Sequence, residues 1–584
     1  MQEAIDRRTF VAGSAAGAAV SALMGIGLTR AQAEEAAAAN GGQTPGFLIP
    51  PDPVTPDRTA DYDVVVVGAG FSGLNCAFSA AQSGASVCLI ERLDQVIGRG
   101  GSTFAINSRL MDEKGYHYTT GMSAPAHDDE KKFDIGRVFK RMMGYHSYRI
   151  DGAKWMLHAH RSEEAMNWMI DNMTTASKVG GYDLTPVMEH WYSDPEGING
   201  EFPGTHEFLD GPNGSGPAAN PQQDVCENLL FYCQDAGVDV HFGTVAQQLA
   251  KDGGRVVGVV CQDPDGTVTQ YNGAKGIVMC TGDFGTNQEM KEAIIPWMKD
   301  VPGGIWEGTG HKMCYWAGAA VDRSGTPAPM VFCFQWRSIT KQVRAFQGLM
   351  VNSDGARYTN EDNVISHGGL SLMHEKGHQA FAIWDDDYAN EPQWQNHAFV
   401  DGDPVFADAD EVRAYWDEVV NGDGYVEMNG SGKIEVRMIK ADTVEELVEQ
   451  LGLPAEETLA QIERYNKYCD QGFDEEFDKR PELLLPVKTA PFYGIKCTPW
   501  FLTTTGGIRC NEKMQVQDAD DNIIPGLYCL GSMVGDMYNN CYSTHFPGHN
   551  LGATCLTFGY LTGKYLCLVI IGRVDKALPT AAAP

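Results

Sequence analysis

The chain has 584 residues, 43% hydrophobic and 21% charged, which is the composition of a folded protein with more than one core and excludes a disordered chain. Its formal net charge is −33, from 77 acidic against 44 basic residues. Such a field repels nucleic acid and anionic membrane surfaces, so we exclude both as main partners, whereas a cationic partner or simple solubility is compatible with it.

The cysteine pattern argues against a metal centre. The 15 cysteines stand singly along the chain, with no C-x-x-C pair and no Cys/His cluster at ligand spacing. The sequence therefore predicts no zinc site, no iron–sulfur cluster and no covalently attached haem. The odd number also argues against a complete disulfide framework.

Residues 1–33 have the pattern of an export signal. Arg7 and Arg8 precede an apolar run of small residues, and an A-x-A cleavage pattern ends at Ala33. Paired arginines before a mild apolar run are typical of a twin-arginine signal, with an ordinary secretory signal or an uncleaved anchor as alternatives. We expect export to the periplasm or the outer face of the cell membrane, a linker over 34–60, and no transmembrane segment in the mature chain.

The first strong strand pattern opens a dinucleotide-binding motif. The β-branched run 62–67 leads directly into a G-x-G-x-x-G turn at 68–73, and a helical segment, 74–82, follows. A second apolar run, 86–90, ends at Glu91. Strand, glycine turn, helix, strand and acid in this order predict a bound dinucleotide. A glycine-rich turn without a ligand is the alternative.

Each residue of this motif has a predicted task. Gly68 allows the tight turn, Gly70 lets the backbone approach a pyrophosphate, and Gly73 lets the helix pack on the strand. Ser72 lies in the glycine turn just before the predicted helix, whose N-terminus offers N–H groups and partial positive charge to phosphates. Glu91 can accept hydrogen bonds from ribose hydroxyls.

A second turn of glycine and hydroxyl residues, 98–103, follows Glu91 and makes Ser102 and Thr103 candidate ligands of an extended FAD. Here the chain resembles the flavoprotein subunits and soluble relatives of fumarate reductase. That family includes flavocytochrome c, urocanate reductase, 3-ketosteroid dehydrogenases and cardiac glycoside reductase-like enzymes. Some members attach FAD covalently through a histidine in this turn. None stands in this turn here, so the resemblance implies non-covalent FAD.

The resemblance continues to the far end of the chain. Four later segments are similar to motifs of the family: 281–287, 348–361, 524–531 and 547–552. The resemblance implies further FAD contacts at Ser532, Leu551 and Gly552. It also implies a helix over 553–562 whose N-terminus stabilises the negative charge of reduced flavin.

The residues that bind fumarate in this family are missing. Leu502 and Thr503 replace the paired histidines of H-H-T-M-G-G, and no arginine stands in 362–367, where the proton-donating arginine is expected. The second substrate arginine falls at about Phe546, as does the catalytic tyrosine of ketosteroid dehydrogenases, whose Y-P-G the chain resembles there. A dicarboxylate cannot be clamped without these cations, so we exclude fumarate as the substrate.

The loop 536–549 offers candidate proton donors. Reduction of an activated C=C bond needs hydride from the flavin and a proton from a group within hydrogen-bond reach. Tyr538, Tyr542, His545 and His549 are the candidates, and His549 stands where the family contacts substrate. A tyrosine could donate the proton or bind a substrate carbonyl. Packed aromatic rings and surface imidazoles are the alternative interpretation.

The expected fold class is α/β. A Rossmann-like FAD-binding domain in two parts, 61–325 and 486–584, is interrupted by an α+β cap domain, 326–485. The substrate is expected between the cap and the flavin, where closure excludes water. Trp500 and Phe501 predict a larger and more apolar pocket, which suits an aromatic or polycyclic substrate, unless they belong to the core.

The electron supply must be external, because the chain has no haem motif and no second dinucleotide motif in the required context. Our hypothesis is that a separate cytochrome c or a membrane quinol oxidase is the donor. The favoured function is reduction of an α,β-unsaturated carbonyl or acid other than fumarate, because the cell exterior lacks soluble nicotinamide. A 3-ketosteroid-type dehydrogenase, and a flavin electron carrier without substrate chemistry, are the alternatives.

Overall fold

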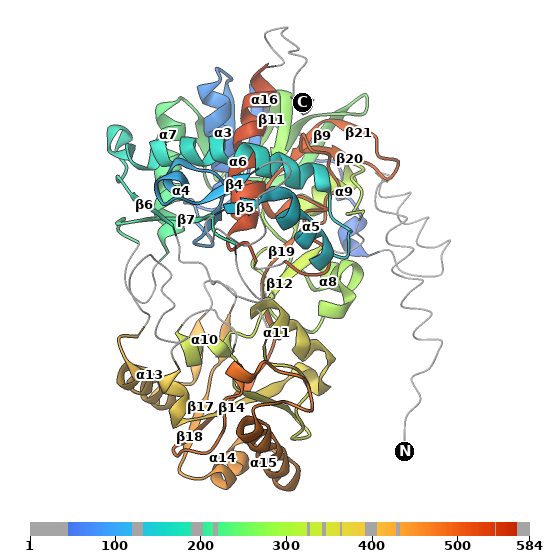
Figure 1. The fold of residues 1–584 in the computed structure, drawn as a ribbon. Helices are drawn as coiled ribbons and strands as arrows, with labels where there is room; N and C mark the ends of the chain where they lie inside the picture. The colour runs from blue at the N-terminus through green and yellow to red at the C-terminus, as the bar shows by residue number, and fades with distance from the viewer. Residues whose placement is uncertain are drawn as a thin grey trace.

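The structure is a computed structural model, and it describes residues 45–119, 132–188, 202–213, 220–323, 327–341, 346–362, 365–391, 406–427, 432–542 and 545–568. The predicted export signal, 1–33, lies outside these residues. Figure 1 shows an upper part that contains segments from both ends of the chain, called here the main domain, and a lower part, the cap domain. Among the described residues no helix has the length and apolar character needed to span a bilayer.

The main domain is built on an eight-stranded sheet. Its strands are β1 (Arg58–Val67), β2 (Val87–Ile90), β8 (Asp239–His241), β9 (Val245–Asp252), β10 (Arg255–Gln262), β11 (Val268–Met279), β20 (Gln515–Gln517) and β21 (Ile523–Cys529). The order is β20-β21-β11-β1-β2-β8, with β10 paired to β11 and β9 to β10. Strands β21, β11, β1, β2 and β8 are parallel. The valines at 64–67 are at most 3% exposed, as expected where a parallel strand is covered on both faces.

Three helices bring distant parts of the chain together on this sheet: α3 (Phe71–Gln82), α7 (Pro221–Asp235) and α16 (Phe558–Leu568). Helix α3 packs against both of the others. The Ser79 hydroxyl donates a 2.7 Å hydrogen bond to the carbonyl of Tyr560. A Cβ added at Gly563 would lie 2.6 Å from the carbonyl oxygen of Cys76, so this glycine permits the close approach of α16 to α3.

The remaining elements complete the main domain, and the longest helix among them is α6. They are α4 (Arg109–Glu113), α5 (Ile135–Tyr145), α6 (Gly152–Met173), α8 (Gln288–Ile294), α9 (Thr309–Trp316), β3 (Thr103–Phe104), β4 (His117–Thr119), β5 (Lys132–Asp134), β6 (Thr185–Met188), β7 (Thr205–Leu209), the 3-10 turns η1 (Gly46–Leu48) and η8 (Gly531–Met533), and the π-helix η9 (Leu551–Thr557). Asp151 caps α6, because its carboxylate accepts from the backbone N–H groups of Ala153 and Lys154. Helix α6 then packs against η9.

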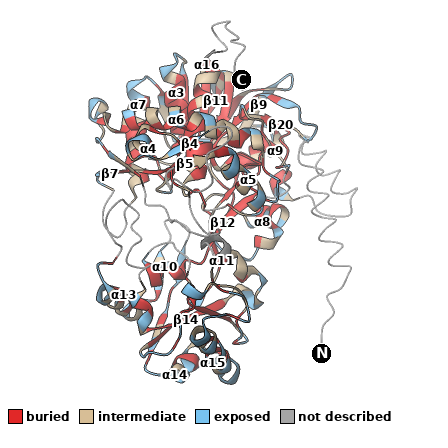
Figure 2. Cartoon of the chain, viewed as in Figure 1, coloured by how far each residue is buried: buried red, intermediate tan, exposed pale blue. Residues whose placement is uncertain are grey.

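The cap domain has its own antiparallel sheet, ordered β13-β14-β18-β17. Its elements are α10 (Gln335–Thr340), β13 (Leu349–Asn352), α11 (Ile365–Ser371), β14 (Ala380–Asp385), α13 (Ala409–Asn421), β15 (Tyr425–Glu427), β16 (Lys433–Glu435), β17 (Met438–Ala441), α14 (Val444–Leu451), α15 (Ala455–Gln471) and β18 (Phe492–Cys497). Alternate residues of β14 enter two cores. Trp384 packs into one and Ile383 into the other. Burial on both faces is visible in Figure 2 as red strands in the lower part.

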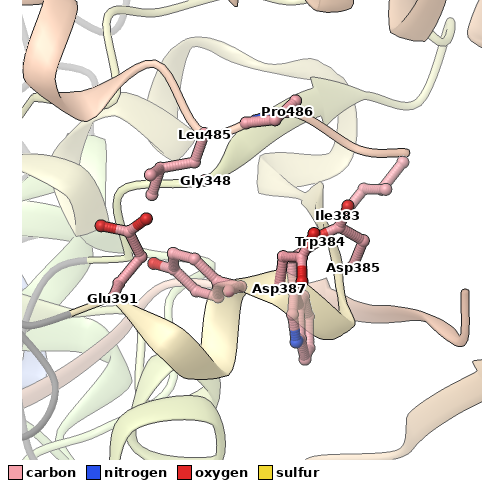
Figure 3. Close-up of a pocket in the computed structure, with 9 residues that line it drawn as sticks. Gly348, Ile383, Trp384, Asp385, Asp387, Glu391, Leu485 and Pro486 are labelled. Carbon is pink, nitrogen blue, oxygen red and sulfur yellow. The ribbon is translucent and has the colours of Figure 1, made fainter. Parts of the chain in front are cut away.

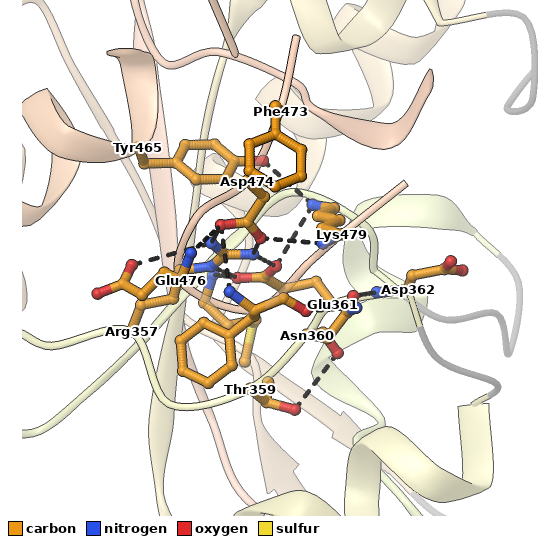
Figure 4. A network of polar contacts seen from close by, with 12 residues as sticks. Arg357, Thr359, Asn360, Glu361, Asp362, Tyr465, Phe473, Asp474, Glu476 and Lys479 are labelled. Atoms are coloured by element: carbon orange, nitrogen blue, oxygen red, sulfur yellow. Dashed lines mark hydrogen bonds and ion pairs between the residues drawn. The ribbon is translucent and has the colours of Figure 1, made fainter. Parts of the chain in front are cut away.

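A buried ionic cluster holds one side of the cap together (Figure 4). Arg357 contacts Glu361 at 2.6 Å and Asp474 at 2.8 Å, and all three side chains are fully buried. Lys479 lies 3.4 Å from Glu361 and donates to the phenol oxygen of Tyr465 at 3.1 Å. Because two carboxylates face two cations, each charge has an opposite partner, which offsets much of the cost of burial.

A two-stranded ribbon joins the domains. It consists of β12 (Ala328–Phe332) and β19 (Trp500–Thr505), which pair antiparallel. In Figure 1 this ribbon lies between the upper and lower parts. The chain therefore enters the cap along β12 and returns along β19.

The α/β class and the interruption by an α+β cap are confirmed, but two predicted boundaries were wrong. Strand β18 was assigned to the second part of the main domain, 486–584, and it pairs with β14 and β17 of the cap instead. The predicted linker 34–60 was too long at its C-terminal end. Strand β1 begins at Arg58, and Phe47 and Leu48 are buried against the main domain. The Trp316 indole donates to the carbonyl of Phe47 at 2.9 Å and holds this segment in place.

Candidate active site

The glycine turn after β1 has the geometry that its motif predicts. Gly68 has φ +108°, and its N–H donates to Ile90 of β2 at 2.7 Å. A Cβ at Gly68 would clash with the carbonyl of Cys280, and one at Gly73 would clash with the carbonyl of Gly68. Glycine is therefore required at both positions, for the turn and for the approach of α3 to β1.

The N-terminus of α3 faces open space. Gly70 is its N-cap and provides no side-chain cap, and a Cβ placed there would meet no protein atom within 4 Å. The first N–H groups of a helix lack intrahelical partners and carry partial positive charge. Glu91 closes the turn from β2, because its carboxylate accepts from Ala69 N at 2.8 Å and Leu93 N at 3.0 Å. The turn therefore fits a dinucleotide phosphate.

The other predicted cofactor residues gather around this turn from both ends of the chain. A Cβ on Gly548 would clash with the carbonyl of Ser102, and one on Gly552 would clash with the carbonyl of Phe104. Thr103 lies in β3 and is 1% exposed. The 98–103 turn is thus seated directly on the segment 548–552.

Leu551 and Ser532 complete this arrangement. A Cβ on Gly100 would lie 2.7 Å from Cδ1 of Leu551, and one on Gly531 would lie 2.7 Å from Oγ of Ser72. The carbonyl of Ser532 accepts from the N–H of Gly506 at 2.8 Å. The structure therefore brings the ten predicted cofactor residues to one edge of the sheet. The run predicted as a helix over 553–562 is a π-helix, η9, followed by α16.

Three of the four candidate proton donors form one buried cluster. The phenol oxygen of Tyr538 lies 2.6 Å from Nδ1 of His549, and the rings of Tyr538 and Tyr542 make an edge contact with centroids 4.6 Å apart. The phenol oxygen of Tyr542 accepts from the backbone N–H of Asn550 at 3.1 Å. All three side chains are at most 3% exposed. His545 is also buried, but it stacks on Tyr145 of α5 with centroids 4.0 Å apart.

Helix α6 supplies two partners that the sequence did not single out. Trp155 stacks on the imidazole of His549 with centroids 4.2 Å apart, and His158 makes an edge contact with it at 4.8 Å. Trp155 also donates from its indole to the carbonyl of Met537 at 2.7 Å. Their spacing of three residues on one helix face could have indicated a shared contact. Nothing in the sequence links α6 to residue 549.

Burial controls protonation in this cluster. It raises the pKa of Tyr538 well above the usual tyrosine value and the pKa of Tyr542 to about 12. It lowers the pKa of His549 well below the usual histidine value, and the neighbouring His158 and His146 lower it further. At neutral pH the phenols therefore keep their protons and the imidazole of His549 is uncharged.

The cluster meets the ribbon between the domains. The N–H of Tyr542 donates to the carbonyl of Pro329 in β12 at 3.2 Å, and Pro329 pairs with Thr504 of β19. In the same strand, the Thr503 hydroxyl donates to the carboxylate of Asp283 at 2.9 Å. The strand that replaces the paired histidines of the resembling family therefore lies beside the loop that carries the candidate donors.

The expectation that Trp500 and Phe501 widen the pocket was wrong for Phe501. Phe501 is 0% exposed and belongs to the main core, where its ring lies against Gly285 and Gly304. Trp500 is 7% exposed and belongs to a core of the cap. A cavity of about 30 Å³ lies elsewhere, in the cap between β14 and Glu391 (Figure 3). It has room for about two water molecules and is too small for the expected substrate.

Comparisons with known proteins agree with this geometry. The family model for the FAD binding domain, FAD_binding_2, matches residues 63–544. Vinyl phenol reductase of Lactiplantibacillus plantarum is 26% identical over 526 residues, which cover 86% of this chain and 95% of that protein. A cytochrome-type fumarate reductase of Shewanella frigidimarina is 26% identical over 522 residues, covering 86% and 76%.

A similar fold is found in 3-ketosteroid Δ1-dehydrogenase of Sterolibacterium denitrificans. The TM-score is 0.61 at 18% identity, over 87% of this chain and 100% of that chain. The family match spans most of the chain and includes the glycine turn, Glu91, Tyr538 and Tyr542, and it ends before His545 and His549. The chain therefore belongs to the FAD_binding_2 family and is an FAD-dependent oxidoreductase.

Proposed function

We propose that this protein is an exported FAD-dependent reductase of an activated C=C bond in an aromatic or polycyclic α,β-unsaturated carbonyl or acid other than fumarate. The observation that carries the proposal is the buried Tyr538–His549 pair, joined at 2.6 Å beside η9. A protonated phenol held by a neutral imidazole is a suitable proton donor to a carbanion-like carbon.

The proposal also assigns the residues that would bind the cofactor. Gly68, Gly70, Ser72, Gly73 and Glu91 would hold the dinucleotide half of FAD at the N-terminus of α3. Ser102, Thr103, Ser532, Leu551 and Gly552 would hold the flavin half. The 98–103 turn contains no histidine, so binding is non-covalent. When bound, FAD supplies the hydride for the reaction.

The protein side chains provide the proton and its control. Tyr538 would give its proton from the phenol oxygen, and His549 would orient that oxygen by donating to it from Nδ1–H. Tyr542 holds the N–H of Asn550 and so positions the start of η9. His545, on a separate contact with Tyr145, has a supporting part in shaping this loop.

The substrate class follows from the charges at the matching positions. Leu502, Thr503 and Phe546 stand where fumarate reductases have their cations, and a dicarboxylate binds poorly without such groups. Similarity to a vinyl phenol reductase across 95% of that protein supports an aromatic substrate. The aromatic rings of Phe546 and Phe104 pack against each other with centroids 4.7 Å apart. They lie in the part of the fold that carries the candidate donors.

Electrons would come from outside the chain, from a cytochrome c or a membrane quinol oxidase, and the twin-arginine pattern at residues 1–33 supports export before this exchange. The net charge of −33 suits a cationic electron donor. Rapid reduction of the bound FAD by NADH, together with no reduction by any cytochrome donor, would contradict this part of the proposal.

The test is a substrate screen with the purified holoprotein and dithionite-reduced viologen. Hydroxystyrenes, cinnamates, cyclic enones and fumarate are compared, and substrate-dependent viologen oxidation with the aromatic compounds but not with fumarate supports the proposal. Reduction of an artificial acceptor by a saturated 3-ketosteroid, with no activity in the first assay, would favour the dehydrogenase instead. The F-P-G sequence at residues 546–548 supports that second candidate. Silence in both assays would favour an electron carrier.

A further inference from the structure

Arg99 is a half-buried cation in the 98–103 turn, and its Nε is an unused hydrogen-bond donor. Its Nε is enclosed by protein, and none of the described residues provides it with a hydrogen-bond partner. Burial lowers the pKa of Arg99, and the acidic group that opposes this effect is Asp283. The carboxylate of Asp283 is already occupied by the N–H groups of Gly285 and Trp306 and by the Thr503 hydroxyl. An arginine placed this way is incomplete without an anion.

The backbone of Arg99 is fixed from the opposite side. The N–H of Gly98 donates to Oε1 of Gln223 at 2.8 Å, and the Asn220 side chain donates to the carbonyl of Gly98 at 3.0 Å. Both partners belong to the start of α7. Because the loop is held on α7, the Arg99 side chain has a defined direction, which points to Trp306. Its Cζ lies 5.9 Å from the centre of that ring.

The sheet topology indicates which strand end lies between Arg99 and Trp306. Arg99 follows β2, whereas Trp306 lies at the end of β11, where a Cβ on Gly282 would clash with the indole. Strand β1 lies between β2 and β11 and ends in the Gly68 turn. A side chain that reaches from the β2 side to the β11 side at this edge crosses the end of β1. The N-terminus of α3, where a Cβ on Gly70 would meet no protein atom within 4 Å, begins at the same end of β1.

Arg92 takes a parallel route. It follows Glu91 at the end of β2, and its Cζ lies 4.4 Å from the same Trp306 ring. Stacking on an indole holds a guanidinium in place and leaves its edge N–H groups available for an anion. Arg92 and Arg99 therefore both lie against Trp306 near the carboxyl edge of the sheet, the edge at which α3 begins.

We propose that Arg99 binds the diphosphate of FAD, with Arg92 as a weaker and more exposed second contact. The diphosphate carries two negative charges and presents oxygen pairs that match the fork of a guanidinium. The cation would add to the helix N-terminus at Gly70, which supplies only partial charge. This role concerns the cofactor of the family and does not depend on which substrate the enzyme reduces.

The experiment compares binding of FAD, ADP and riboflavin to the full chain after removal of FAD. Riboflavin has the isoalloxazine ring of FAD but lacks the diphosphate, whereas ADP has the diphosphate but lacks the isoalloxazine ring. In Arg99→Gln we expect the Kd for FAD and ADP to rise about 10- to 100-fold, as for loss of a hydrogen bond to a charged group. The Kd for riboflavin stays unchanged. Arg92→Gln should give a smaller change in the same direction.

The control is Arg109→Gln, which removes a surface arginine paired with Asp171 at 2.6 Å and should leave all three affinities unchanged. Equal weakening of FAD, ADP and riboflavin in Arg99→Gln would overturn the proposal, because it would indicate a general effect on the fold. Unchanged affinity for FAD and ADP would also overturn it. If Arg99→Gln does not fold, Arg99→Lys, which keeps the charge, is loaded with FAD, and a shift of the diphosphate resonances in its phosphorus NMR spectrum is required. The absence of that shift rejects the contact.

Discussion

The phenol oxygen of Tyr538 lies 2.6 Å from Nδ1 of His549, and Trp155 of α6 contacts both rings. The two residues belong to one loop, but the helix that contacts them comes from residues 152–173. The candidate proton donor is therefore held by parts of the protein that are remote in sequence.

Removing the Tyr538 hydroxyl should slow the reaction without loss of the cofactor. In Tyr538→Phe we expect kcat to fall by about 10²- to 10⁴-fold, the range for loss of a general acid, with FAD content and absorbance spectrum unchanged. Stopped-flow oxidation of the reduced enzyme by its substrate measures this step. Tyr148→Phe is the matched control, because Tyr148 is 65% exposed. An unchanged rate in Tyr538→Phe would exclude this phenol as the donor.

The buried histidines should make stability depend on pH. Burial lowers the pKa of His158 to about 3 and lowers that of His549 as well. Below about pH 6.5 these histidines bind protons in the unfolded chain but not in the folded chain. The free energy of unfolding therefore falls as the pH drops below about 6.5. His158→Phe should reduce this slope. Urea denaturation at several pH values measures it.

His117→Gln is the comparison for that experiment, because the His117 side chain is 49% exposed and pairs with Asp112 at the surface. It should leave the slope between pH 6.5 and 4 as in the wild type. If His158→Phe and the wild type lose stability equally over this range, the buried imidazole is not the source of the dependence.

Two alanine substitutions in the glycine turn should fail in different ways. A Cβ at Gly70 meets no protein atom within 4 Å, so Gly70→Ala should fold normally and bind FAD more weakly, because the methyl group occupies space that the phosphate needs. A Cβ at Gly73 would clash with the carbonyl of Gly68, so Gly73→Ala should lower Tm even without cofactor. Differential scanning calorimetry with and without FAD distinguishes the two. Equal FAD affinity in Gly70→Ala and the wild type would contradict the assignment.

The ionic cluster of the cap should be sensitive to loss of its central cation. Arg357→Met leaves Glu361 and Asp474 buried without that partner, and we expect a loss of about 3–5 kcal/mol of cap stability. Burial alone would raise the pKa of Asp474, but hydrogen bonds from Arg357 keep it below the usual value. The stabilisation from that carboxylate is therefore present above pH 4 and is lost as pH falls through the lower, folded-state pKa.

Tryptophan fluorescence reports this change, because Trp384 and Trp416 lie in the cap core. Lys467→Gln serves as the control, since Lys467 and Glu463 form a surface pair with side chains 69% and 74% exposed, and its effect should be close to zero. A cap transition in Arg357→Met at the wild-type denaturant concentration would show that the cluster does not stabilise the cap.

Local sequence patterns predicted the part of the site that is local. The strand before Gly68, the glycine turn, α3, β2 and Glu91 are consecutive, and each has a residue pattern that its own backbone geometry requires. The ends of α14 also have local signals, since Thr443 caps the helix and Gly452 ends it in a left-handed conformation.

The remaining parts depend on packing between distant segments. The residues of β18 form an apolar strand that either sheet could accept, and only its pairing with β14 places it in the cap. The Pro- and Gly-containing segment before β1 has the composition of a linker, but Phe47 finds a buried position beside Trp316. Arg99 and Trp155 have no local pattern that signals a site, because their partners follow other strands and helices.

The seating of the 98–103 turn on residues 548–552 has a consequence for biosynthesis. The ribosome synthesises the 98–103 turn more than 440 residues before the segment 548–552. While translation proceeds, the nascent N-terminal half can fold around its glycine turn. It still lacks the segment with Gly548 and Gly552 on which the 98–103 turn is seated. Such long-range closure is slow and comes late in folding. Complete enclosure of the vitamin-derived cofactor therefore requires residues 548–552 to have been synthesised.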